Sequence, residues 1–101
     1  MDEKQFSRYF KAFGDPSRLR ILQALTSREM TVGEITIQIG LAQPTISRHL
    51  ALMRDSGIVV DRREGQKVFY SLNKDAIRSC CSGFCNCLEI VVPKAKKSKK
   101  K

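Results

Sequence analysis

Two stretches with helical periodicity, separated by only three residues, constrain the fold of this chain more than any other feature of its sequence. Apolar residues recur at helical spacing in both stretches, as Val32, Ile35 and Ile39 in the first and as Ile46, Leu50 and Met53 in the second. The connection "GLA" at 40–42 begins with a glycine that can end the first helix, and Gly57 can end the second. The segment "ITIQI" alternates like a strand, but the longer pattern favours a helix-turn-helix pair.

The residues before this pair predict two further helices. Between Lys4 and Phe13 the aromatic residues recur at helical steps and form one face. The "GDPS" that follows breaks this pattern, with Asp15 as the expected N-cap and Pro16 at the first position of a second helix. That helix runs through "SRLRILQAL" to the polar "TSRE".

The residues after the pair predict a hairpin and a last helix. Residues 58–72 read as two short strands joined by a polar turn that includes Gly65, with basic residues at the tip. The last helix is expected to begin after Asn73 and to end at Pro93, and Gly83 in its interior could break it. All four cysteines of the chain, Cys80, Cys81, Cys85 and Cys87, fall within this helix.

Composition narrows the class of protein. A chain of 101 residues is expected to form one domain, which we bound at 1–93, with a core small enough that oligomerisation would help it. The net charge of +9 comes mostly from the six lysines of "KAKKSKKK", a segment at 94–101 that we expect to be a disordered tail. Such a tail adds solubility and non-specific attraction to polyanions, or else contacts DNA phosphates. No apolar run could span a membrane and no secretory signal is evident, so we expect a cytoplasmic protein.

The order of elements, mainly α with a small β part and written α-α-α-α-β-β-α, is that of a winged helix-turn-helix domain. Such a domain lays its second paired helix in the major groove of DNA and reaches the flanking backbone with its hairpin. The predicted DNA-binding residues are Gln43, Thr45, Ser47, Arg48 and His49 in that helix, and Arg62, Arg63, Gln66 and Lys67 in the hairpin. The ordinary alternatives are a solvated helix face and, for His49, a packing role.

Three segments carry a family resemblance. "FKAFGDPSRLRILQAL", "QPTISRHLALMRDSGIV" and "DRREGQKVFYSL" resemble the ArsR/SmtB family of bacterial metal-sensing repressors. The resemblance implies a homodimer joined through its first and last helices, which binds operator DNA and is released by a metal ion. It also implies that the two best-known metal sites of the family are absent here, because the helix before the recognition helix has no cysteine and the last helix has no histidine.

The cysteine cluster "CCSGFCNC" resembles the cluster of some arsenic-sensing members. That resemblance implies arsenite or antimonite as inducer, held by three thiolates, for which we choose Cys80, Cys81 and Cys85, with Cys87 as the substitute third ligand. On a continuous helix Cys81 and Cys85 share a face while Cys80 points away from it, so a break at Gly83 or a thiol from the partner subunit is needed.

Several alternatives to arsenic sensing remain open. Cadmium and lead also accept thiolate-rich sites, four thiolates could hold zinc, and clustered thiols could sense redox state. Cysteines can also serve as small apolar packing residues. Neither an organic cofactor nor an enzyme activity is expected, because the sequence contains no phosphate-binding loop and no nucleophile with a partnered base.

Overall fold

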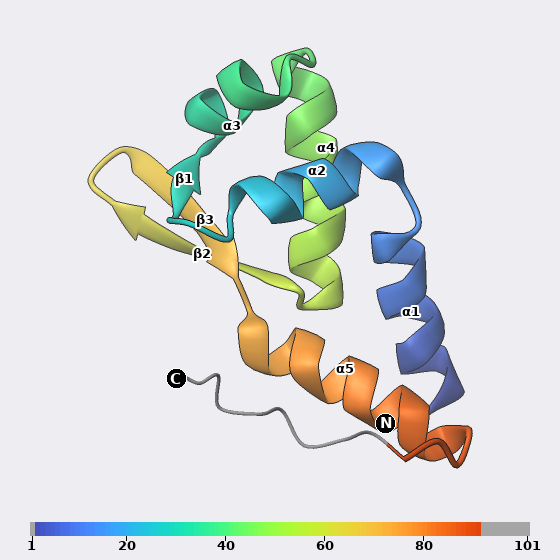
Figure 1. Cartoon of the computed structure of the whole chain (residues 1–101). Helices are drawn as coiled ribbons and strands as arrows, with labels where there is room; N and C mark the ends of the chain where they lie inside the picture. Colours follow the sequence, from blue (N-terminus) through green and yellow to red (C-terminus); the bar gives the residue numbers. More distant parts are fainter. Residues whose placement is uncertain (1, 92–101) are drawn as a thin grey trace, which may run out of the picture.

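A computed structural model describes residues 2–91. Helices and strands follow in the order α1 (Glu3–Phe13), α2 (Pro16–Ala24), β1 (Met30–Thr31), α3 (Val32–Ile39), α4 (Gln43–Ser56), β2 (Val59–Glu64), β3 (Lys67–Leu72) and α5 (Lys74–Cys87). In Figure 1 the β2–β3 hairpin projects from one side of the helical body, and α1 lies on the opposite side with α5 against its N-terminal half. Pro93 and the lysine-rich segment 94–101 lie outside the described residues.

The predicted helix-turn-helix is confirmed as α3 and α4. A capping box starts α3: Thr31 Oγ1 accepts from the backbone N–H of Glu34, and a carboxylate oxygen of Glu34 accepts from the backbone N–H of Thr31. Gly40 ends α3 with φ of 84°, a left-handed conformation that favours glycine, so the strand alternative for "ITIQI" is wrong.

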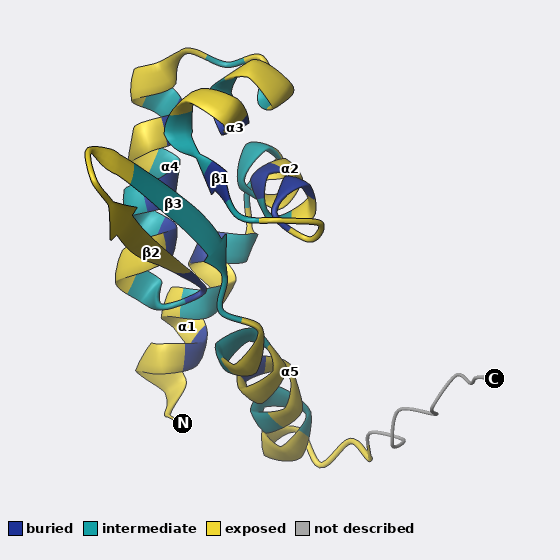
Figure 2. Cartoon of the chain, turned by 90° about the vertical axis from the view of Figure 1, so that its left-hand side faces the viewer, coloured by how far each residue is buried: buried dark blue, intermediate teal, exposed yellow. Residues whose placement is uncertain are grey.

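The core gathers between α2, α3, α4 and the start of β2. The side chains of α4 predicted to point inward, Ile46, Leu50 and Met53, are fully buried, as are Ile21 of α2 and Ile35 of α3. Figure 2 shows these buried positions on the inward sides of the helices, whereas β2 is exposed over most of its length. Gly57 ends α4 with φ of 88°, as predicted.

The hairpin belongs to a three-stranded antiparallel sheet in the order β1-β3-β2. Met30 pairs with Tyr70 and Thr31 with Phe69, which adds the short strand β1 that the sequence did not predict. Two residues are too few to show any periodicity. Through β1 the hairpin is hydrogen-bonded to the residues that lead directly into α3.

The last helix ends earlier than predicted and is continuous at Gly83, where the sequence allowed a break. It starts at the predicted cap, where Asn73 Oδ1 accepts from the backbone N–H of Ala76 at 3.2 Å. It then passes through Gly83 without a break and ends at Cys87, before the predicted end at Pro93. The backbone N–H of Ile90 donates to the carbonyl of Cys85 and that of Glu89 to Asn86, which is a Schellman motif with Glu89 at φ of 60°.

Candidate nucleic-acid interface and cysteine cluster

The outer side of α4 presents the polar residues predicted to contact DNA. Gln43, Ser47 and Arg48 are exposed and Thr45 is half-buried, and none of the four belongs to the buried apolar stripe of the helix. The N-cap residue of α4 is Ala42, whose side chain has no hydrogen-bond acceptor. The first backbone amides of α4 therefore have no side-chain cap. These four residues therefore form one polar surface around the N-terminal half of α4, which we call the α4 face.

His49 does not share the exposure of the α4 face. Its side chain is only 17% exposed, and Nδ1 lies 3.1 Å from Nη1 of Arg18. A guanidinium can only donate hydrogen bonds, so Nδ1 of His49 must be the acceptor in this contact. In the neutral ring the proton is therefore on Nε2. This nitrogen lies 3.9 Å from Oδ2 of Asp15. This arrangement favours the packing alternative for His49.

Arg18 connects three elements around this histidine. Its Nε donates to the carbonyl of Ala12 at 2.8 Å and its Nη2 to the carbonyl of Lys11 at 3.0 Å, both in the last turn of α1. The backbone N–H of Arg18 donates to Asp15, and this hydrogen bond lowers the pKa of that carboxyl. The end of α1, the start of α2 and the middle of α4 are thus joined at one guanidinium.

The hairpin residues predicted to contact DNA are all exposed, but Arg62 differs from the others. Its Nε donates to Oε1 of Glu29 at 3.1 Å, its Nη2 to Oε2 of Glu29 at 3.1 Å, and its Nη1 to Glu64 at 3.2 Å. The guanidinium carbon also lies 4.8 Å from the centre of the Phe69 ring. The hydrogen bonds that Arg62 donates to Glu29, and then to Glu64, raise the pKa of its guanidinium.

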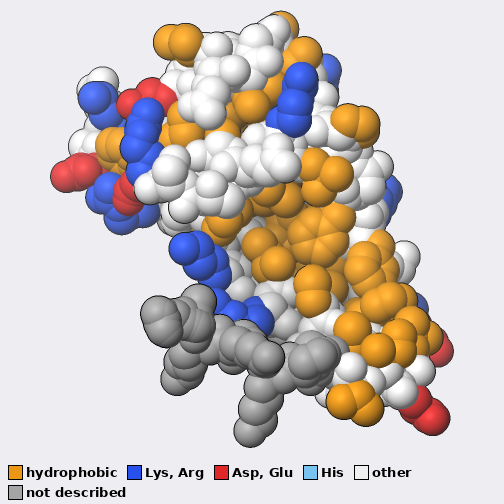
Figure 3. All heavy atoms as spheres, in the orientation of Figure 1, with side chains coloured by type: hydrophobic (Ala, Val, Ile, Leu, Met, Phe, Trp, Pro, Cys, Tyr) orange, Lys and Arg blue, Asp and Glu red, His pale blue; other side chains and the backbone are white. Residues whose placement is uncertain are grey.

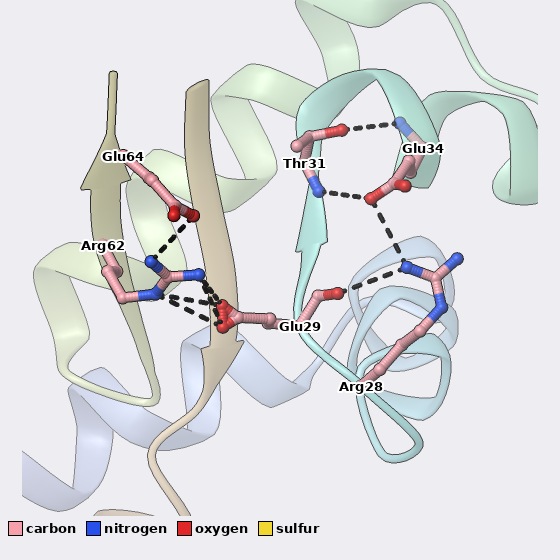
Figure 4. A network of polar contacts seen from close by, with 6 residues as sticks. All are labelled: Arg28, Glu29, Thr31, Glu34, Arg62 and Glu64. Atoms are coloured by element: carbon pink, nitrogen blue, oxygen red, sulfur yellow. Dashed lines mark hydrogen bonds and ion pairs between the residues drawn. The ribbon is translucent and has the colours of Figure 1, made fainter. Parts of the chain in front are cut away.

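Arg28 extends this network to the start of α3 (Figure 4). Its Nη1 donates to the backbone carbonyl of Glu29 at 3.3 Å and to the carboxylate of Glu34 at 3.4 Å. That carboxylate is the one that closes the capping box with Thr31, and the backbone N–H of Thr31 lowers its pKa. Polar contacts therefore run from the hairpin to the helix-turn-helix.

The four cysteines occupy different environments on α5. Cys80 is fully buried, and this burial, followed by the charge of Cys81, raises the pKa of its thiol. Cys81 and Cys87 are exposed, and Cys85 is half-buried. The structure thus separates Cys80 from the three thiols that solvent can reach.

An aromatic cluster joins α5 to α1 beside Gly83. The ring of Phe84 meets Phe6 edge-on with centroids 5.6 Å apart and Phe10 edge-on at 4.6 Å. A side chain at Gly83 would face Phe6. Because α5 is continuous through Gly83, the structure does not contain the break that would fold Cys85 or Cys87 back onto Cys80 and Cys81.

Within residues 2–91 the structure groups no three His, Cys, Asp or Glu side chains closely enough to hold a metal ion. The predicted site of three thiolates from a single chain is therefore not assembled in this conformation. None of the helices in the described range is long and apolar enough to cross a membrane.

An apolar groove of about 420 Å³ runs between α2 and α5. It is lined by Phe13, Leu19, Leu22, Gln23, Thr26, Leu72, Ile77 and Cys81. Figure 3 shows apolar side chains gathered on this face of the molecule. One of the exposed thiols therefore borders an apolar surface.

Sequence reasoning missed Arg18, Arg28 and Glu29, which organise both polar networks. Arg62 and Glu29 are 33 positions apart in the sequence, so no local spacing indicates their contact. Glu29 also stands out by no local feature, because Asp2, Asp15 and Glu34 lie near helix starts as well.

An uncapped recognition helix with an exposed polar face, followed by a basic hairpin, defines a winged-helix protein of the DNA-binding class. Residues 15–60 match the family described as "Bacterial regulatory protein, arsR family". The chain belongs to this family, which consists of DNA-binding transcriptional regulators and not of enzymes.

Individual relatives agree with this assignment. The chain is 35% identical over 77 residues to the transcriptional repressor SdpR of Bacillus subtilis, covering 76% of this chain and 86% of SdpR. It is 43% identical over 67 residues to the arsenic resistance transcriptional regulator ArsR1 of Pseudomonas putida, covering 65% of this chain but only 52% of that relative. The solution structure of the homodimeric winged helix-turn-helix DNA-binding domain of Mb0332 from Mycobacterium bovis matches with a TM-score of 0.71 and 30% identity, over 85% of this chain and 81% of that one.

Proposed function

We propose that this chain is a homodimeric transcriptional repressor of the bacterial cytoplasm, released from operator DNA by trivalent arsenic bound to the cysteines of α5. The observation that carries the DNA-binding part is the α4 face, which is polar and exposed while the apolar stripe of the same helix is fully buried. Arginine, glutamine, threonine and serine are side chains that read base edges in the major groove. Arg63, Gln66 and Lys67 at the hairpin tip supply contacts beside the groove.

The proposed dimer interface lies on α1 and α5. Phe10 of α1 is 38% exposed, and Leu88 and Ile90 beyond the end of α5 are 53% and 52% exposed. Exposed apolar groups of this size, close to an aromatic cluster, are typical of a surface that a second copy covers. The relative Mb0332 is described as homodimeric, which supports the same arrangement here.

For the inducer, the environments of the thiols favour Cys81, Cys85 and Cys87 over our initial choice, which included Cys80. A thiolate must form to bind a soft ion, and burial raises the pKa of Cys80 and thereby opposes this step. Cys81 and Cys85 lie one helical turn apart, where β-carbons are separated by about 5–6 Å. We propose these two as the first ligands, with Cys87 or a thiol of the partner subunit as the third.

Two alternatives rest on the same thiols. Cadmium or lead could replace arsenic, since both are soft ions. Redox sensing is less well supported, because β-carbons about 5–6 Å apart on a regular helix exceed the roughly 3.8 Å of a disulfide. Oxidation would therefore have to unwind α5 or join two subunits.

Fluorescence anisotropy of the reduced protein on DNA from upstream of its own coding sequence tests this proposal. We expect arsenite to release the DNA, and the double variant Cys81→Ser/Cys85→Ser to bind DNA normally but to resist release. Cys80→Ala is the matched control and should still respond. Release of the double variant by arsenite would refute the ligand assignment, whereas release of the wild type by peroxide alone would favour the redox alternative.

A further inference from the structure

Arg62 is the hairpin arginine whose charge is already engaged within the chain. Three of its nitrogens donate to two carboxylates, and its contact with Glu29 is bidentate. Bidentate arginine–carboxylate pairs are the strongest class of exposed ion pair because the planar fork matches both oxygens. The guanidinium is also held over the Phe69 ring.

The sheet register explains why this geometry is built into the fold. Thr31, Phe69 and Arg62 stand in one row across β1, β3 and β2, so their side chains share a face of the sheet. Glu29 precedes Thr31 by two residues and lies on the far side of Phe69 from Arg62. The side chains of Arg62 and Glu29 therefore meet in front of the central strand (Figure 4), and the guanidinium of Arg62 lies over the ring of Phe69.

We infer that Arg62 is a positioning residue of the hairpin and that it does not contact DNA phosphates, contrary to its sequence-based assignment. It fixes the hairpin to the segment that starts α3, through Glu29 and then Arg28. This inference rests on the proposed DNA-binding function.

The charges around Arg62 support this role. Glu29 and Glu64 together carry two negative charges against the one of Arg62, so this cluster of three has a net charge of −1. If Arg62 turned to a phosphate, both carboxylates would lose their partner next to the DNA backbone. Repulsion between these carboxylates and the phosphates opposes such a movement.

Arg63 provides a matched comparison one residue away. It pairs with Val68 across the hairpin and so projects from the opposite face of the sheet to Arg62. Among residues 2–91, no carboxylate forms an ion pair with Arg63. Its charge is therefore available to a phosphate without breaking a contact within the chain.

The experiment measures how DNA affinity depends on salt, because each phosphate contact contributes about −0.9 to the slope of log K against log salt. The probes are two labelled duplexes of equal length, one from upstream of the coding sequence and one of random sequence. We expect Arg63→Met to reduce the magnitude of the slope by about 0.9 for each hairpin that touches DNA. Arg62→Met should leave the slope unchanged but weaken binding to the upstream duplex roughly threefold or more, on the scale of coupling within polar networks.

The substitution Glu29→Gln distinguishes phosphate contact by Arg62 from positioning of the hairpin by Arg62, because the two roles predict opposite changes in DNA affinity. If Arg62 contacted phosphate, removing the competing carboxylate would strengthen binding. If Arg62 positions the hairpin, Glu29→Gln weakens binding although the protein becomes more positive, and the exchange Glu29→Arg/Arg62→Glu restores part of the loss. Circular dichroism at each temperature of measurement confirms that every variant is folded.

Besides stronger binding by Glu29→Gln, either of two results for Arg62→Met would overturn the inference. One is a fall in slope for Arg62→Met as large as that for Arg63→Met. The other is an unchanged affinity and slope for Arg62→Met, which would leave Arg62 without either role. If the wild-type protein binds neither duplex, it is the proposed DNA-binding function that fails.

Discussion

Replacing Gly83 by alanine should stabilise the protein, although the residue lies against an aromatic cluster. Gly83 is in the interior of a continuous helix, where glycine costs about 1 kcal/mol relative to alanine. A methyl group at this position would lie 3.5 Å from Cζ and 3.6 Å from Cε1 of Phe6, which is ordinary van der Waals contact. The structure therefore offers room for the methyl group without moving the ring.

The matched control is Gly40→Ala, the same substitution at the end of α3. Nothing lies within 4 Å of a methyl group at Gly40, but its φ of 84° is unfavourable for any residue with a β-carbon. This change should destabilise the protein by about 1–2 kcal/mol. We thus expect Gly83→Ala to raise the free energy of unfolding through helix propensity. Gly40→Ala should lower it through an unfavourable backbone conformation.

Urea unfolding and thermal unfolding, both followed by circular dichroism at one fixed protein concentration, measure the effects of the two substitutions. For Gly83→Ala we expect a gain of about 1 kcal/mol and a rise in Tm of about 4–8 °C, with an unchanged m-value. A loss of stability in Gly83→Ala would show that α5 bends at this position or that Phe6 approaches more closely than described. Such a result would mean that α5 is not a regular helix through Gly83. The arrangement of the cysteines along α5, with Cys80 separated from the other thiols, would then be wrong as well.

Three further predictions concern the caps and the buried thiol. Thr31→Ala removes one half of the capping box and should cost about 1 kcal/mol in urea unfolding, whereas a cost near zero would mean that Glu34 alone caps the helix. Because the pKa values of Asp15 and Glu34 are lowered in the folded state, their stabilising effect is present above about pH 4.5 and is lost as the pH falls through the folded values. Glu34→Gln should therefore flatten the acid side of a stability profile, and an unchanged profile would contradict this. Cys80→Ser should lower stability by about 1–3 kcal/mol because it buries a hydroxyl, while Cys81→Ser should be nearly neutral, and equal effects would argue against the different environments.

The parts of the fold that local sequence determines were predictable. The inward stripe of α4, the caps at Asp15 and Asn73 and the glycine ends of α3 and α4 all follow from spacing or residue type within a few positions. These features depend on interactions inside one helix or between a helix and its own flanks. The same holds for the hairpin, which follows from its β-branched and aromatic residues and from the polar turn at Gly65.

The features that the sequence did not predict depend on contacts between distant residues. β1 forms only because β3 provides a partner for two residues. Cys80 is fully buried although its neighbour Cys81 is exposed, and the aromatic cluster that joins α1 to α5 pairs Phe6 with Phe84, almost 80 positions away. His49 and Arg62 looked like free polar residues because their partners, Arg18 and Glu29, lie more than 30 positions away.

The sheet order also affects how the protein avoids aggregation. Because β3 is the central strand, β2 is an edge whose outer side has no strand beside it among the described residues. Four consecutive charged residues, 61–64, occupy this edge. Charged side chains on an edge strand discourage another chain from adding as a further strand. The exposed hairpin is thus protected from pairing with its own copies by the charges on its edge strand.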